Sequence, residues 1–141
     1  MSRRRYVLDA SALIGHFEDR EGTALRVERL MEEALRSEVP LLMSTVNWGE
    51  VFYIVWKLYG EAKAHVAEAN VSDMPIVFIP ADFARATRAA ALKQKHNLGY
   101  ADSFAAELAI EHSASVVTAD PEFARVGKTL SIYPLPRHES S

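Results

Sequence analysis

Four acidic residues occupy places in the sequence from which folding could bring them together. Asp9 ends the apolar run YVLD, and Asp120 ends the run SVVTAD. Glu50 lies on a predicted helix after LLMS, and Asp102 lies in the first turn of a predicted helix over residues 97–112. Four carboxylates in one place repel one another unless a cation lies between them, and the simplest such cation is a divalent metal held by oxygen ligands. A ligand set made only of carboxylates suits Mg²⁺ or Mn²⁺ rather than zinc.

The elements that must position these acids alternate between strands and helices. Runs such as IVFI and SVVT are apolar at every position, which is typical of parallel strands buried on both faces. Ligands of such sheets bind outside the carboxyl ends of the strands, where Asp9 and Asp120 lie. We expect strands at 6–8, 41–44, 76–80, 115–119 and 130–135, and helices at 10–17, 24–37, 46–60, 61–70, 83–97, 97–112 and 121–126.

The second of these helices, over residues 24–37, is predicted from an amphipathic pattern. Thr23 is expected to cap it. Its apolar side chains are expected to point inward: Leu25, Val27, Leu30, Met31, Ala34 and Leu35.

Length and composition indicate one globular domain over residues 1–141. The chain is 49% hydrophobic and 25% charged and has no cysteine, which excludes disulfides, thiolate zinc sites and a cysteine nucleophile. The net charge of -3 excludes nucleic-acid binding by overall charge alone. No apolar segment is long enough to span a bilayer, and we expect a cytoplasmic protein with no membrane association.

Taken singly, each acid also has a purely structural explanation. Asp102 is favoured at a helix N-terminus by the helix dipole. Asp120 is placed to cap a helix because Pro121 suits the first helical position. Asp9 could be a turn residue and Glu50 a solvated helix position. Taken together, two acids at strand ends and two near helix N-termini form an arrangement that stability does not require.

Four segments in order, YVLDASALI, STVNWGEV, LGYADSFAAELA and VVTADPEF, resemble the motifs of PIN-domain ribonucleases. The resemblance covers essentially the whole chain and is closest to the VapC-type toxins of toxin–antitoxin pairs. It implies an α/β fold, a three-layer α/β/α sandwich with a mostly parallel five-stranded sheet. It also implies Mg²⁺- or Mn²⁺-dependent endoribonuclease activity, a homodimer, and a small antitoxin protein as partner.

The same resemblance assigns roles to individual residues. The acidic quartet that would hold the metal and catalyse cleavage is Asp9, Glu50, Asp102 and Asp120. Thr118 matches a hydroxyl that supports the site. Ser11 either assists Asp9 or caps the following helix. Hydrolysis by a metal-activated water would leave a 5′-phosphate and a 3′-hydroxyl.

Other functions remain open from the sequence. A metal-free ribonuclease would use imidazole groups, but the five histidines (His16, His65, His96, His112 and His138) are scattered through polar contexts. A structure-specific DNA nuclease would use the same acids. A protein-binding module would use them to hold a structural ion.

The helix over residues 46–59 carries three stripes at the helical period. The first, Glu50, Tyr53 and Lys57, is predicted to face the site. The second, Asn47, Val51, Ile54 and Leu58, is predicted to face the core. The third contains Trp48, Phe52, Val55 and Tyr59, with Trp56 beside it. We expect Trp48, Phe52, Trp56 and Tyr59 to bind an amphipathic antitoxin helix unless residues 61–70 cover them.

Overall fold

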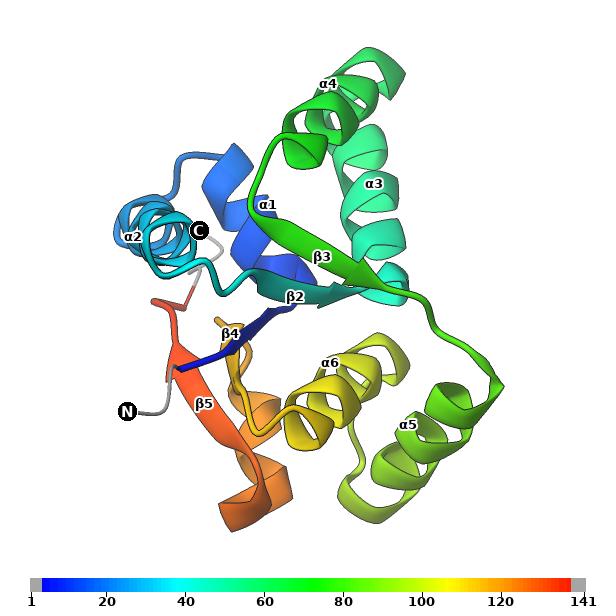
Figure 1. Ribbon diagram of the computed structural model, residues 1–141. Helices are drawn as coiled ribbons and strands as arrows, with labels where there is room; N and C mark the ends of the chain where they lie inside the picture. The colour runs from blue at the N-terminus through cyan, green and yellow to red at the C-terminus, as the bar shows by residue number, and fades with distance from the viewer. Residues whose placement is uncertain (1–3, 138–141) are drawn as a thin grey trace.

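The computed structural model describes residues 4–137, so His138 lies outside the described part of the chain. A five-stranded sheet with strand order β3-β2-β1-β4-β5 forms its centre, and all four strand pairs are parallel (Figure 1). The strands are β1 (Tyr6–Leu8), β2 (Leu41–Ser44), β3 (Ile76–Ile79), β4 (Ser115–Thr118) and β5 (Ser131–Pro134). The helices are α1 (Ala10–Phe17), α2 (Thr23–Ser37), α3 (Thr45–Tyr59), α4 (Glu61–Ser72), α5 (Phe83–His96), α6 (Tyr100–Glu111) and a 3₁₀ segment, η1 (Pro121–Thr129).

Two hydrophobic cores lie on the two faces of this sheet. Alternate residues of β1 divide between them, because Tyr6 and Leu8 join one core while Val7 joins the other. The first core is closed by α1, α2, α3 and α4, and the second by α6 and η1. The predicted three-layer α/β/α sandwich is therefore confirmed, and the sheet is entirely parallel.

The helices on the first face begin close to the carboxyl ends of their strands. The carboxylate of Asp9 caps α1 by accepting a hydrogen bond from the backbone N–H of Ala12, and Ser44 caps α3 through the N–H of Val46. These short junctions fix the direction in which α1 and α3 leave the sheet. Polar side chains at the junctions consequently gather at one edge of the sheet.

The prediction for α2 is wrong at its start and on part of its surface. Thr23 is the first helical residue, and the capping position is held by Gly22, whose φ of 81° suits glycine. Leu25 and Leu35 are 51% and 66% exposed. The helix packs on the molecule through Val27, Leu30 and Ala34, with Met31 partly buried beside them, so Leu25 and Leu35 face outward.

Helix α5 contributes little to the hydrophobic cores. Ala89 is its only fully buried residue, and it lies beside α6 at the periphery of the fold (Figure 1). Ion pairs supplement this small apolar contact: Arg85 and Arg88 of α5 both bind Glu107 of α6, whose side chain is 4% exposed, and both reach Glu111. None of the helices in the described residues is long and apolar enough to cross a membrane.

Candidate functional site

A cleft of about 270 Å³ opens at the carboxyl edge of the sheet. It lies where β1 is flanked by β2 on one side and by β4 on the other, which is the reversal of strand order at which open α/β sheets bind ligands. The described residues lining the cleft are Asp9, Ala10, Ser11, Ile14, Arg20, Glu50, Ile54, Leu58, Asp102 and Asp120. All four acids singled out in the sequence thus line one cleft, although they come from four separate segments of the chain.

Asp9 is the deepest of these acids, with 2% of its surface exposed. Its Oδ1 accepts hydrogen bonds from the Ser11 hydroxyl at 2.6 Å and from the Ala12 N–H at 3.1 Å. Its Oδ2 accepts a short hydrogen bond from the Thr118 hydroxyl. Burial raises the pKa of Asp9 to about 6, and the two hydroxyl donors partly oppose that shift.

Ser11 and Thr118 also tie two strand ends together. The Ser11 hydroxyl accepts from the N–H of Ala119 at 3.0 Å, and the Thr118 hydroxyl accepts from the N–H of Asp120 at 2.9 Å. Each hydroxyl therefore donates to Asp9 and accepts from the segment after β4. This arrangement orients the carboxylate of Asp9 and holds Asp120 next to it.

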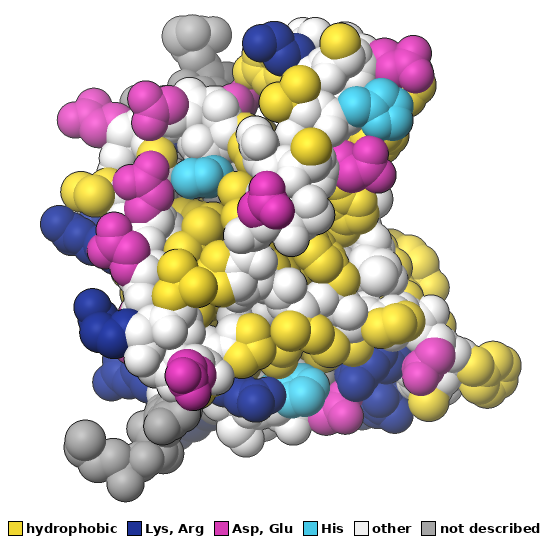
Figure 2. All heavy atoms as spheres, turned by 45° about the horizontal axis from the view of Figure 1, so that its top comes forward, with side chains coloured by type: hydrophobic (Ala, Val, Ile, Leu, Met, Phe, Trp, Pro, Cys, Tyr) yellow, Lys and Arg dark blue, Asp and Glu magenta, His cyan; other side chains and the backbone are white. Residues whose placement is uncertain are grey.

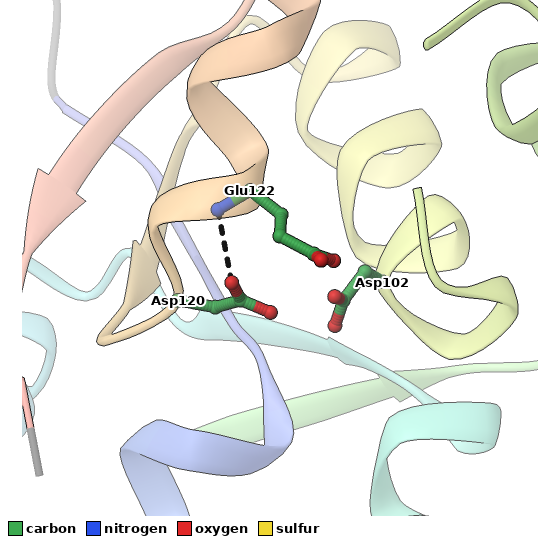
Figure 3. A group of neighbouring side chains, drawn as sticks. All are labelled: Asp102, Asp120 and Glu122. Carbon is green, nitrogen blue, oxygen red and sulfur yellow. Dashed lines mark hydrogen bonds between the residues drawn. The ribbon is translucent and has the colours of Figure 1, made fainter. Parts of the chain in front are cut away.

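A second group of carboxylates consists of Asp102, Asp120 and Glu122 (Figure 3). One oxygen from each lies within 4.8 Å of the others, a spacing at which the three could hold a metal ion. Asp120 caps η1 by accepting from the Glu122 N–H at 2.9 Å, which also confirms its expected capping role. Burial, followed by the hydrogen bond with Asp120 and the charges of the neighbouring acids, raises the pKa of Asp102 to about 8.

Glu122 was missed in the sequence because the helix predicted over residues 121–126 is too short to show a periodic face. The only available signal was local: it follows Asp120 by two residues in the segment Asp-Pro-Glu, at the start of a turn. With Asp120 capping the start of η1, the Glu122 side chain points toward Asp102 (Figure 3).

Glu50 lies in the second turn of α3 and faces the same cleft. Burial and the charge of Asp120 raise its pKa. One turn earlier, the fully buried Asn47 donates from Nδ2 to the carbonyl oxygen of Ala101 at 3.0 Å. This bond joins α3 to the first turn of α6, next to Asp102.

The rest of α3 is turned differently from the prediction. Its buried row is Asn47, Val51 and Val55, which follows steps of four residues. The adjacent row with the same step contains Ile54 and Leu58, and these line the acidic cleft with Glu50.

The expectation that Tyr53 and Lys57 face the site is therefore wrong. They line a shallow depression of about 430 Å³ on the outer surface of α3, together with Phe52 and Trp56. Leu58, expected in the core, is 56% exposed at the cleft.

The aromatic stripe of α3 is partly covered. Trp48 and Phe52 are half-buried and pack against the first core, Trp48 against Phe78 of β3 and Phe52 against His65 of α4. Trp56 and Tyr59 remain 44% and 52% exposed. Residues 61–70 therefore cover part of the aromatic stripe, and its last turn, with Trp56 and Tyr59, stays exposed.

Comparison with known proteins places this geometry in a family. The family model for the PIN domain matches residues 6–129. The chain therefore belongs to the PIN domain family, whose members are generally nucleases, and the family prediction is confirmed. A comparison with curated proteins finds no match.

Several solved structures share the fold. VapBC2 of Rickettsia felis, bound to a promoter DNA fragment, superposes with a TM-score of 0.72 at 16% identity, over 92% of this chain and 98% of that one. A toxin–antitoxin complex from Klebsiella pneumoniae gives 0.62 at 21% identity, over 92% and 98%. VapC20 of Mycobacterium tuberculosis, a toxin that cleaves the sarcin–ricin loop, gives 0.67 at 13% identity, over 86% and 95%.

Proposed function

We propose that this protein is a divalent-metal-dependent endoribonuclease that acts as the toxin of a toxin–antitoxin pair. The observation that carries the proposal is the convergence of Asp9, Glu50, Asp102 and Asp120 on one cleft at the carboxyl edge of the sheet. Raised pKa values at Asp9, Glu50 and Asp102 mean that these carboxyl groups are poorly compensated without a cation. A divalent cation would supply that compensation.

The residues present fit Mg²⁺ or Mn²⁺, because every candidate ligand is a carboxylate. Asp102, Asp120 and Glu122 would hold one ion, and Asp9 and Glu50 would complete the ligand set of that ion or of a second one. A bound ion would lower the pKa of a water molecule and stabilise the charge that develops on the phosphate.

The protein's own groups would orient this chemistry. Ser11 and Thr118 keep the Asp9 carboxylate fixed by donating to each of its oxygens. Where Glu50 does not bind the ion directly, its carboxylate, which lines the cleft and has a raised pKa, would accept a proton from the attacking water. Attack by water would leave a 5′-phosphate and a 3′-hydroxyl.

Product analysis tests this mechanism against the histidine alternative. Labelled RNA incubated with the protein and Mg²⁺ or Mn²⁺ should give 5′-phosphate ends, and EDTA should stop the reaction. Cleavage that persists in EDTA with 2′,3′-cyclic phosphate ends would contradict the proposal. No histidine of the described chain lines the cleft. Single-stranded DNA and flap DNA in the same assay test the DNA-nuclease alternative.

The proposed partners are an RNA substrate, a cognate antitoxin and a second copy of the chain in a homodimer, all in the cytoplasm. Structural likeness to a toxin–antitoxin complex supports the antitoxin. Figure 2 shows a face on which hydrophobic side chains gather between acidic and basic ones. Of the four residues expected to bind the antitoxin, we propose that Trp56 and Tyr59 make direct contact, while Phe52 and Trp48 support them from below.

A further inference from the structure

Arg20 is the only basic residue among those that line the acidic cleft in the described part of the chain. It belongs to the connection between α1 and α2, a segment that carries none of the acids of the proposed site. A cation in a cleft with four carboxylates is usually there to neutralise them. Arg20 has a different partner: its guanidinium forms an ion pair with Glu18.

Among residues 4–137, Arg20 forms no ion pair with an acid of the cleft, and its ion pair is with Glu18. Its guanidinium lines the cleft without bridging the four carboxylates there.

The backbone around Arg20 is fixed by hydrogen bonds. Its N–H donates to the carbonyl oxygen of Gly15 at 2.9 Å, and its own carbonyl oxygen accepts from the N–H groups of Thr23 and Ala24 at 3.1 Å each. Arg20 therefore extends from a rigid corner of the fold.

Glu18 and Tyr59 hold the guanidinium from one side. Arg20 Nη2 pairs with Glu18 Oε1, while the Tyr59 hydroxyl of α3 donates to Glu18 Oε2. Arg20 Nε is buried and has no hydrogen-bond partner among residues 4–137, so it is not the atom that a ligand would reach. The Arg20 side chain as a whole is 24% exposed and lines the cleft, and this exposed part of the guanidinium is open to a ligand oxygen.

We infer that Arg20 binds a backbone phosphate of the RNA substrate inside the cleft, and that Glu18 and Tyr59 are positioning residues for it. A guanidinium presents a planar set of donors that matches the oxygens of a phosphate, which a point charge does not. The inference rests on the proposed function, because it assumes that the polyanion entering the cleft is RNA. Arg20 would supply a direct contact to the phosphate, which the carboxylates of the cleft cannot make without a cation.

The test measures binding of a single-stranded RNA oligonucleotide at several salt concentrations. The protein carries Asp102→Asn, so that cleavage does not interfere. Arg20→Gln should weaken binding by about tenfold and lower the slope of log affinity against log salt by about one phosphate contact. Arg20→Lys should recover the salt slope and only part of the affinity. Arg29→Gln, which changes an exposed arginine of α2, is the matched control and should change neither.

Tyr59→Phe separates the effect of positioning Arg20 from the effect of its charge. It removes only the hydroxyl that holds Glu18, so it should weaken binding less than Arg20→Gln and leave the salt slope unchanged. In the cleaving protein, Arg20→Gln should raise KM more than it lowers kcat.

Two results would overturn the inference in distinguishable ways. If the Asp102→Asn protein binds RNA and Arg20→Gln has the same affinity and slope as Arg29→Gln, the assignment of Arg20 fails while the proposed function stands. If the protein with Arg20 intact binds no RNA, the proposed function fails and the inference fails with it. If Arg20→Gln does not fold, Arg20→Lys decides, since affinity equal to that of the parent would exclude a bidentate contact.

Discussion

Asn47 and Ala101 connect the two helices that carry Glu50 and Asp102. The side-chain amide of Asn47 donates to the carbonyl oxygen of Ala101 at 3.0 Å, in a place where Asn47 is completely buried. The bond sets the distance between α3 and the first turn of α6. The spacing of two acids of the proposed site thus depends on a residue that does not line the cleft.

We expect Asn47→Ala to impair both stability and cleavage. Loss of a buried hydrogen bond should lower the free energy of unfolding by about 1–2 kcal/mol. Since Glu50 and Asp102 would no longer be held in register, kcat should fall more than the small loss of stability explains. Denaturant unfolding and steady-state kinetics measure the two effects. Asn70→Ala, on the exposed surface of α4, is the control. Unchanged kcat in a folded Asn47→Ala protein would show that the bond has no role in the site.

Asp102→Asn should abolish RNA cleavage without unfolding the protein. The substitution removes one carboxylate from a crowded acidic group, and the raised pKa of about 8 means that the metal-free fold already favours the neutral form of this side chain. The thermal midpoint in EDTA should therefore stay equal or increase. Cleavage by this variant at the rate of the unaltered protein would contradict the assignment of Asp102.

The metal-free protein should become less stable as the pH rises. The pKa values of Asp9 and Asp102 are raised from 3.8 to about 6 and about 8, so the folded state binds more protons than the unfolded state across this range. Its free energy of unfolding must then fall as the pH rises from about 4 to about 8. Binding of a divalent cation should strengthen over the same interval, since the ion competes with those protons.

Urea titrations in EDTA at several pH values measure this loss of stability, and repeating them with Asp102→Asn provides the control. The variant should lose less stability with rising pH because Asp102, one of the carboxyl groups with a raised pKa, no longer titrates. An identical pH profile for the two proteins would show that Asp102 is not protonated in the fold.

Glu122→Gln should weaken Mn²⁺ binding by roughly tenfold or more, because it replaces a charged ligand of the group formed with Asp102 and Asp120. Isothermal titration with Mn²⁺ measures the affinity. Glu32→Gln, on the exposed side of α2, keeps the net charge equal and should bind Mn²⁺ normally. Equal affinities for the two variants would remove Glu122 from the ligand set.

Trp56→Glu should leave the protein folded and active while weakening inhibition by the antitoxin. Trp56 is 44% exposed, so a charged residue there does not enter the core. Phe52→Glu should instead destabilise the protein, because Phe52 packs against the first core and His65. Inhibition assays with the purified antitoxin measure the effect. Full inhibition of an active Trp56→Glu protein would place the antitoxin on another surface.

The sequence was informative wherever one strand or one helix determines the position of a residue. Asp9 and Asp120 follow apolar runs, and their positions at the carboxyl edge follow from the parallel topology. The rotation of a helix about its own axis could not be predicted in this way, because it depends on every element that packs against the helix. On α3 the contacts with the sheet and α4 select a row in steps of four residues, which brings Ile54 rather than Tyr53 to the cleft.

Glu122 and Arg20 escaped sequence analysis for a related reason. Arg20 lies in a short connection and Glu122 in the first turn of η1; neither segment shows periodic patterning, and both positions are fixed by hydrogen bonds made only after folding. Apart from the Asp-Pro-Glu segment at Glu122, nothing in the residue types around them distinguishes them from solvated charges. Only the completed cleft shows that one faces Asp102 and that the other lines the same cavity.

The ion pairs between α5 and α6 have a consequence for how the molecule opens. Salt weakens the more exposed of these ion pairs, those with Glu111, whereas it leaves a tightly packed apolar interface in place. With Ala89 as its only fully buried residue, α5 belongs to the low-stability end of the fold. We therefore expect α5 to open before the sheet does, so that partial unfolding of the molecule would begin outside the acidic cleft.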